Sequence, residues 1–218
     1  MPFPIVFPSQ NGPGRLLELC SFRRSKISES RYDEVFDGIT VITSTFPISR
    51  QSLYGRKIDQ PDISVLIADW TSAEEKDVFE PGEQYQSIKP AFGELISPEN
   101  TDFACHHLIL TGPAATPEAG VYLVRFYTVP VSKHQEFGSR LNEHISSFFE
   151  KQGPIFFVVA PSRENQQVVV CIWGWAKAED AKNYLQSEGF RHFQKAGESL
   201  YTSVEEYQAK LKKWEARK

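Results

Sequence analysis

The sequence predicts an α+β protein: two ferredoxin-like repeats with antiparallel sheets, packed as a pseudo-dimeric α+β barrel. An internal sequence repeat is the first observation behind this prediction, because such repeats indicate duplicated structural units. A break that contains glycine and proline near the middle of the chain is the second. A similar order of strand and helix signals in the two halves is the third. Each sheet would leave one face apolar, so we expect the two faces to pack together.

The composition is that of an ordinary globular protein, with 218 residues of which 40% are hydrophobic and 24% charged. The net charge is −4, and no basic stripe carries interleaved aromatic residues, so we expect no nucleic-acid partner. No apolar run reaches the length of a membrane span, and prolines interrupt the apolar N-terminus, so we expect a cytoplasmic protein with no membrane partner. Cys20, Cys105 and Cys171 lie in separate apolar runs, which favours reduced packing residues.

The internal repeat aligns residues 63–75 with residues 168–180. Each segment begins as an apolar strand that ends in a tryptophan, Trp70 in the first and Trp175 in the second. A short polar turn and an acidic helix start follow in both segments. The match therefore predicts the same strand-to-helix connection in the two halves.

The boundary between the halves is predicted at Thr111–Glu118. One glycine and two prolines in this segment disfavour both helix and strand. The sequence therefore predicts an N-terminal repeat over residues 1–112 and a C-terminal repeat over residues 118–218.

The first half alternates strand and helix signals in the order strand, helix, two strands, two helices and strand. The first helix has Ser28 as a candidate N-cap and apolar residues at helical spacing. The predicted ranges are 15–22, 28–42, 52–58, 63–70, 72–79, 83–95 and 103–110.

The second half repeats this order up to its last element. Strand 120–129 is rich in β-forming residues, and the helix that follows begins at Ser132 and stops before Gly153. No fourth strand is evident in this half, and residues 4–7 are only a guess for that sheet edge. The remaining predicted elements are strands 155–160 and 168–175, helices 178–185 and 190–196, and a final helix 203–215 with a capping box.

The second half resembles antibiotic-biosynthesis-monooxygenase (ABM) domains of the dimeric α+β barrel superfamily, in a tandem form of fungal type. The resemblance is carried by strand 121–128, the helix from Ser132, strand 168–175 and the segment 178–193. Two sheets of this family close into a barrel by dimerisation, so a similar tandem chain is expected to close its own barrel. A homodimer of two such chains is possible, and the sequence does not decide between monomer and homodimer. The resemblance implies an enzyme that needs no metal or organic cofactor, either a monooxygenase or a polyketide cyclase.

Strand 121–128 offers two faces, because successive strand residues point to opposite sides. The more apolar face, which carries Phe126, is expected to pack under the helices, and this would turn Arg125 and Tyr127 toward the barrel interior. A buried arginine needs a partner, and two stay open: an anionic oxygen of a substrate, or a protein carboxylate such as Asp69. Arg125 and Tyr127 are therefore candidate catalytic residues.

His106 and His107 are consecutive on a predicted strand, so they face opposite ways, and the register that decides which faces inward is open. His107 is a candidate general base and His106 a candidate substrate contact. His192 lies where the resembled family often carries a functional histidine, which makes it another catalytic candidate, whereas His134 and His144 are expected to face solvent. No third ligand lies at a metal-like spacing in the sequence, so we predict no metal site.

Trp70, Trp173 and Trp175 are candidate walls of a substrate cavity, with ordinary core packing as the alternative. Phosphate-binding glycine loops and serine nucleophile elbows are absent from the sequence, so nucleotide and flavin cofactors have no support. The sequence thus favours a cofactor-independent monooxygenase or cyclase that acts on a small aromatic or polyketide-like molecule in a barrel cavity. Two alternatives stay open: a non-catalytic barrel that binds a hydrophobic ligand, and a structural tandem whose interior is filled by aromatic side chains.

Overall fold

The computed structural model describes residue 7 and residues 14–44, 49–110, 118–152 and 154–213. Most of the predicted linker, and residues 4–6 of the guessed strand at residues 4–7, fall outside this part of the chain, so the domain boundary stays a prediction. None of the helices in the described residues is both long and apolar enough to cross a membrane.

The first repeat follows the predicted order, and its element ends differ from the predicted ends by only a few residues. Ser72 caps the helix after the third strand, because its hydroxyl accepts a hydrogen bond from the Glu75 N–H at 3.1 Å. The elements are β1 (Arg15–Arg23), α1 (Glu29–Ser44), β2 (Ser49–Lys57), β3 (Ile63–Trp70), α2 (Ala73–Phe79), α3 (Glu83–Leu95) and β4 (Ala104–Leu110).

The second repeat has the same order of elements, with a short 3-10 turn before its long helix. Both repeats therefore consist of strand, helix, two strands, two helices and strand. The elements are β5 (Val121–Thr128), η1 (Val131–Lys133), α4 (His134–Gln152), β6 (Phe156–Pro161), β7 (Val168–Trp175), α5 (Ala178–Gln186), α6 (Glu188–Gly197) and β8 (Ser203–Lys213).

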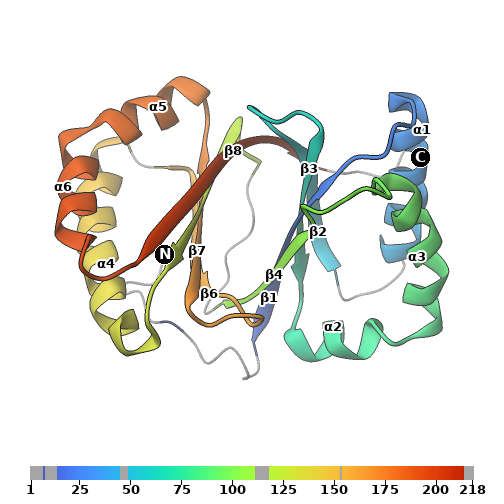
Figure 1. The fold of residues 1–218 in the computed structure, drawn as a ribbon, viewed down its shortest axis with the longest axis horizontal. Helices are drawn as coiled ribbons and strands as arrows, with labels where there is room; N and C mark the ends of the chain where they lie inside the picture. Colours follow the sequence, from blue (N-terminus) through green and yellow to red (C-terminus); the bar gives the residue numbers. More distant parts are fainter. Residues whose placement is uncertain (1–6, 8–13, 45–48, 111–117, 153, 214–218) are drawn as a thin grey trace.

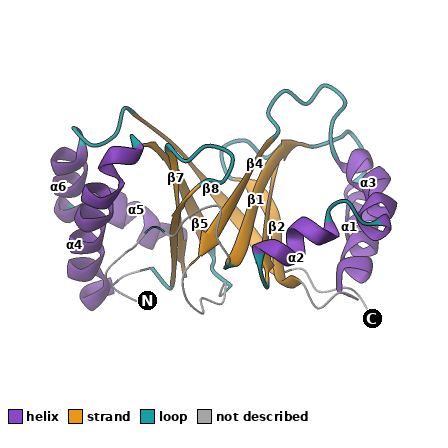
Figure 2. Cartoon of the chain, turned by 90° about the horizontal axis from the view of Figure 1, so that it is seen from below, coloured by secondary structure: helices purple, strands orange, loops and turns teal. Residues whose placement is uncertain are grey.

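The strands form one antiparallel sheet of eight in the order β4-β1-β3-β2-β8-β5-β7-β6. Within each repeat the order is fourth, first, third, second, which is the ferredoxin-like arrangement. Helices α1–α3 cover the outer face of one half and α4–α6 cover the outer face of the other, so the two inner faces meet in a nearly closed barrel (Figures 1 and 2). This arrangement confirms the predicted α+β fold class.

The predicted final helix at 203–215 is wrong, since Ser203–Lys213 is the strand β8. It pairs antiparallel with β5 on one side and with β2 on the other, so it joins the two halves of the sheet. Ala209 and Leu211 are buried and Lys210 between them is exposed, which is the alternation of a half-buried strand. Without β8, the facing edges of β2 and β5 would leave backbone N–H and C=O groups without partners. Pairing with both edges satisfies these groups, and this outweighs the local capping signal that favoured a helix.

Three apolar clusters form the core, one under each helix layer and one inside the barrel. The interior cluster is filled by aliphatic side chains from both repeats, so the barrel interior is a packed core. It includes Leu17, Leu19, Val65, Ile67, Val124, Val158, Val170, Ile172 and Leu211.

The expected orientation of β5 is wrong. Tyr122 and Val124 belong to the interior cluster and Phe126 packs against it, whereas Tyr127 packs under the helices of the second repeat. Arg125 shares the helix-facing side with Tyr127 and is also buried. Both faces of this strand are covered, so hydrophobicity alone could not distinguish them.

Candidate functional site

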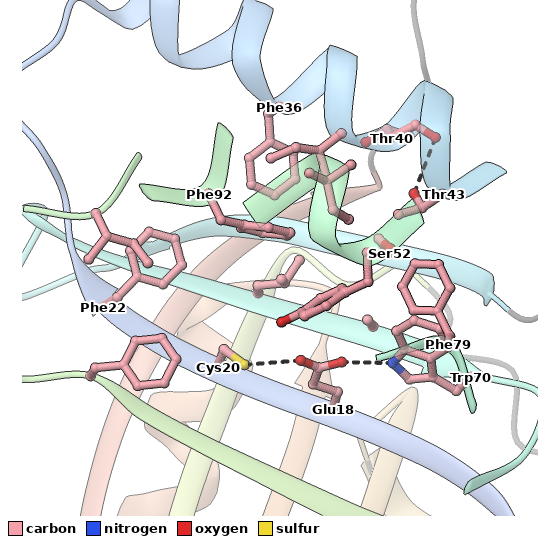
Figure 3. Close-up of a pocket in the computed structure, with 17 residues that line it drawn as sticks. Glu18, Cys20, Phe22, Phe36, Thr40, Thr43, Ser52, Trp70, Phe79 and Phe92 are labelled. Atoms are coloured by element: carbon pink, nitrogen blue, oxygen red, sulfur yellow. Dashed lines mark hydrogen bonds between the residues drawn. The ribbon is translucent and has the colours of Figure 1, made fainter. Parts of the chain in front are cut away.

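A cavity of about 170 Å³ lies in the first repeat, between the outer face of its sheet and helices α1–α3 (Figure 3). Its walls are mostly apolar, and both the sheet and the three helices contribute side chains. Aromatic rings dominate the walls, as is common in small-molecule sites. They include Phe22, Phe36, Trp70, Phe79, Tyr85 and Phe92.

Among the described residues that line this cavity, Glu18 on β1 is the one that carries a carboxylate. The Trp70 indole N–H donates to Glu18 Oε2 at 2.8 Å, and the Cys20 thiol donates to Glu18 Oε1 at 3.5 Å (Figure 3). The Glu18 side chain is 16% exposed. The cavity thus combines apolar walls with one anchored proton acceptor.

The register of the strands relates the two repeats residue by residue. Leu16 lies opposite Trp70 across β1 and β3, and Val121 lies opposite Trp175 across β5 and β7. The tryptophans matched in the sequence are therefore equivalent in space. The same registers assign to most residues of β1, β2 and β3 an equivalent residue in β5, β6 and β7.

Side-chain size at two equivalent positions explains why the cavity lies in the first repeat. Ala68 and Ser52 are paired across β2 and β3, whereas Trp173 and Phe157 are paired at the equivalent place in the second repeat. The Trp173 and Phe157 rings pack edge to face with centroids 4.6 Å apart. Two rings in the second repeat therefore fill the space that two small side chains leave open in the first.

Arg125 occupies the position equivalent to Cys20, since the two residues lie opposite Cys171 and Leu66 in matching registers. Its guanidinium forms an ion pair with Glu206 and donates to the Tyr127 hydroxyl at 2.9 Å. It also lies over the Phe190 ring, 4.5 Å from the centroid. Arg125 therefore pairs with a protein carboxylate, as one of the two open alternatives held, although Asp69 itself pairs with Arg15.

The remaining predicted site residues do not meet in one cavity. Trp70 lines the cavity under the helices of the first repeat, on the other side of the sheet from the barrel cavity for which it was predicted. Trp173 and Trp175 belong with Tyr127 to the packed cluster under the helices of the second repeat. His192 is exposed on α6.

His106 and His107 face opposite ways, and the structure decides which faces where. The His106 ring lies inside the barrel, 5.0 Å from the Phe126 ring, and its Nδ1 lies 3.1 Å from the Ser162 hydroxyl. Burial lowers the pKa of His106. His107 points to the other side, where its Nε2 lies 3.9 Å from Glu18 Oε1. His107, not His106, is thus the histidine near the cavity.

The expectation that His144 faces solvent is wrong, because the side chain is buried under the helix layer of the second repeat. Its Nε2 shares a hydrogen bond of 2.8 Å with the Tyr184 hydroxyl, and its ring stacks on Phe193 at 4.8 Å. Burial lowers the pKa of His144 to about 4. His134 is half-buried, and burial lowers its pKa as well.

Sequence reasoning missed Glu18 as a site residue. The available signal was a lone carboxylate in an otherwise apolar strand, Arg15-Leu-Leu-Glu-Leu-Cys-Ser-Phe22. A charged residue is rarely buried unless it has partners or a function. Its partners lie on β3 and β4, far away in the sequence, so only the fold reveals them.

Comparisons with known proteins agree with this fold. A family model described as antibiotic biosynthesis monooxygenase matches residues 120–196. A solved structure of a "putative monooxygenase" from Fusobacterium nucleatum superposes with a TM-score of 0.71 at 9% identity, over 92% of this chain and 94% of that one. An anthrone oxidase-like protein superposes with a TM-score of 0.67 at 15% identity, over 97% of both chains. No curated protein matches the chain.

At these identities the solved structures show the fold, and they show it over the whole chain. The family match covers the second repeat from β5 to the end of α6 and supports a monooxygenase-like function in general. Residues 120–196 thus match the antibiotic biosynthesis monooxygenase family model, and the chain as a whole shares the nearly closed α+β barrel fold of these solved structures.

Proposed function

We propose that the protein is a cofactor-independent oxygenase whose substrate is a small, electron-rich aromatic molecule bound in the cavity of the first repeat. The ABM match supports monooxygenase chemistry in general. The finer proposal rests on one observation, which is that an aromatic-lined cavity holds a single carboxylate, Glu18, among its lining residues. This site differs from the barrel cavity that the sequence predicted, and buried side chains of both repeats pack together inside the barrel.

Glu18 is the proposed general base. It would take a proton from an activated methylene or phenol of the substrate, and general bases typically accelerate reactions by about 10²–10⁴-fold. The apolar walls would desolvate the resulting anion, which makes it a stronger electron donor toward O2. The Trp70 indole, which donates to Glu18 Oε2, keeps the carboxylate in place.

The proposed reaction balances with O2 as the only co-reactant. The methylene carbanion forms a bond to O2, and the peroxide takes back the proton that Glu18 removed. The hydroperoxide then loses water and leaves a ketone at that carbon, so one oxygen atom enters the product and the other enters water. No external electron donor is needed for this step.

Lys76 supplies a positive charge close to this chemistry. Burial acts to lower its pKa, but Glu18 and Glu80 outweigh that effect, so the pKa is raised and the ammonium stays charged. Its Nζ lies 5.5 Å from the centroid of the Trp70 ring. Lys76 is not among the lining residues, so its charge would favour a developing anion in the cavity from behind the Trp70 wall.

The volume of the cavity limits the substrate. A dry protein cavity of about 150 Å³ accommodates benzene. The cavity here is about 170 Å³ and is partly open, which suits one or two fused rings. We therefore expect activity on bicyclic compounds with an activated methylene and much weaker activity on three-ring compounds.

The test measures oxygen uptake with activated methylene compounds of one, two and three rings. We expect the Glu18→Gln variant to retain binding and lose about 100-fold or more in uptake rate. The matched control is Glu179→Gln, which neutralises an exposed carboxylate on α5 and is expected to change nothing. Unchanged uptake in Glu18→Gln would contradict the role of Glu18, and saturable binding without uptake would favour a ligand-binding protein instead.

A further inference from the structure

A set of potential metal ligands lies beside the cavity, where β1 meets β4. One ligand atom each from Glu18, Cys105 and His107 lies within 4.8 Å of the others. We propose that these residues, with Cys20 as the fourth donor, bind Zn²⁺ or a divalent ion of similar ligand preference. This inference goes beyond the proposed oxygenase and does not depend on it.

Strand register brings the four donors together. Glu18 lies directly opposite His107, and Cys20 lies directly opposite Cys105, in the antiparallel pairing of β1 with β4. Residues two apart on a strand share a face, so the two pairs form a compact group on the helix-facing side. Ligand spacing along the chain could not indicate this group, because its members come from two strands that are far apart in the sequence.

His107 is held in the orientation that a metal ligand requires. Its Nδ1 lies 2.5 Å from Glu164 Oε1, so a proton on Nδ1 is shared with that carboxylate and the lone pair is left on Nε2. Nε2 is buried and has no hydrogen-bond partner within the described residues, yet it lies 3.9 Å from Glu18 Oε1. A carboxylate behind a ligating histidine is the usual second contact in zinc sites.

Glu164 is itself fixed by the loop between β6 and β7. Its Oε2 accepts from the Ser162 hydroxyl at 2.6 Å and from the His107 backbone N–H at 2.9 Å. The orientation of His107 is therefore fixed by the second repeat, although the ligands belong to the first.

Glu18 is anchored in the same way. Trp70 holds Oε2, which leaves Oε1 facing the two thiols, with Cys20 Sγ at 3.5 Å and Cys105 Sγ at 3.7 Å. Metal binding would replace the two thiol protons, and the ion would take the place of both S–H···O contacts.

The donor set matches zinc better than calcium or magnesium. Thiolate and imidazole ligands suit zinc and related ions, whereas hard ions prefer oxygen alone. Donor atoms in a tetrahedral zinc site lie about 3.3–3.8 Å apart, given bonds of about 2.0–2.3 Å. The donor atoms of Glu18, Cys105 and His107 lie within 4.8 Å of one another, and Cys20 Sγ lies 3.5 Å from Glu18 Oε1, so small side-chain movements would contract the group around an ion.

The second repeat lacks this donor set, which makes the site specific to the first. The register places Leu123 and Arg125 at the positions of Glu18 and Cys20, and Gln208 and Glu206 at those of His107 and Cys105. A leucine and an arginine supply no ligand atom. One zinc ion per chain is therefore expected.

The experiment titrates the reduced full-length protein with Zn²⁺ by calorimetry, and with Co²⁺ by near-ultraviolet absorption, which reports sulfur ligation. We expect one ion per chain, a sulfur-to-cobalt band, and a loss of affinity of about 100-fold or more in Cys105→Ser and His107→Ala. Glu164→Gln is expected to weaken binding by about 10–100-fold, as for other second contacts. The exposed His192→Ala is the control that should bind like the parent protein.

Thermal unfolding of each variant without metal shows whether it is folded, so a folding defect cannot be mistaken for a lost ligand. The proposal is refuted by the absence of saturable binding, or by equal binding in folded His107→Ala. Zinc binding by a protein whose zinc-free form shows no oxygen uptake would refute only the oxygenase, and oxygen uptake by a protein that does not bind zinc would refute only the metal site. If both hold, Zn²⁺ occupies Glu18, and uptake should fall as zinc occupancy rises.

Discussion

Ala68 and Trp173 occupy equivalent positions in the two repeats, and their side-chain volumes separate a cavity from a packed core. Ala68 lines the cavity beside Trp70. Trp173 instead contacts Phe157, Tyr184 and His144. A duplicated fold can thus keep an open site in one copy and use the same place for packing in the other.

The Ala68→Trp variant tests this interpretation. We expect the indole to fill the cavity, as Trp173 does in the second repeat, so that calorimetric binding of 2-naphthol is lost. Added volume in a packed region costs about 1–3 kcal/mol, which a thermal unfolding measurement would detect. The control is Ala178→Trp, which adds the same ring at an exposed position of α5. Equal affinity in Ala68→Trp and the parent protein would place the ligand elsewhere.

His144 gives the protein a pH dependence of stability. The pKa of the folded state is lowered from 6.5 to about 4 by burial, so protons bind the unfolded chain more strongly in this interval. The stability that the protein has with neutral His144 is fully present above about pH 6.5. The free energy of unfolding then falls by up to roughly 3 kcal/mol as the pH falls toward 4. Urea unfolding from pH 8 to 4 measures this. The His144→Gln variant should show a flatter profile, and a profile as steep as that of the parent protein would contradict the assignment.

At the scale of elements, β8 decides how the two repeats are joined. It is the last strand of the second repeat, yet it pairs with β2 of the first along Leu53–Lys57. Gly55 allows this close pairing, because a Cβ there would lie 1.8 Å from the Lys210 carbonyl oxygen. The backbone of β8 therefore passes where any side chain at position 55 would be.

Gly55→Ala is expected to destabilise the protein by more than the roughly 1 kcal/mol typical of point mutations, because β2 and β8 must separate locally. The matched control is Gly38→Ala in α1, where an added Cβ meets nothing within 4 Å. That change should stabilise the helix by about 0.5–1 kcal/mol. Denaturant unfolding of both variants measures the two effects, and equal free energies of unfolding would show that the β2–β8 pairing tolerates a side chain.

At the scale of the whole molecule, two contacts of different kinds join the two repeats around the barrel. β2 and β8 form a hydrogen-bonded ladder on one side of the barrel. On the other side, the loop after β6 reaches β4, where the Arg163 N–H donates to the His107 carbonyl at 2.9 Å. Arg163 also forms a two-pronged ion pair with Asp77 of α2, with both contacts at 3.0 Å. The second contact is made by side chains and single hydrogen bonds, so it depends more on charge.

Glu164 makes that contact sensitive to acid. Burial acts to raise its pKa, but hydrogen bonds from His107 and Ser162 outweigh it and lower the pKa to about 2, from 4.5. The stabilisation that ionised Glu164 gives the folded state is present above pH 4.5 and is lost as the pH falls toward 2. Unfolding measured over this range should show a shallower acid loss in Glu164→Gln, which cannot ionise. An identical acid loss in the two proteins would exclude Glu164 as the cause.

Part of the candidate site could be predicted from the sequence. Trp70 was predicted as a wall and His107 as a base of a cavity inside the barrel, whereas both side chains lie on the helix-facing side of the sheet, next to Glu18. Arg125, Tyr127, Trp173 and Trp175 were placed at the same cavity, but they lie in the packed second repeat. A tryptophan or arginine on a strand looks the same whether its neighbours across the sheet are small or large, so the sequence could not separate the repeats.

The amino-acid sequence by itself determined the duplication, the order of elements up to α6 and the α+β class, because these depend on local periodicity and on chain breaks. Only the tertiary structure decided three things: that 203–213 is a strand, which face of β5 is inside, and that Glu18, Cys20, Cys105 and His107 meet. The reason is physical. A strand's pairing, its buried face and its neighbours across a ladder are set by partners that are distant along the chain, and a local pattern contains no information about those partners.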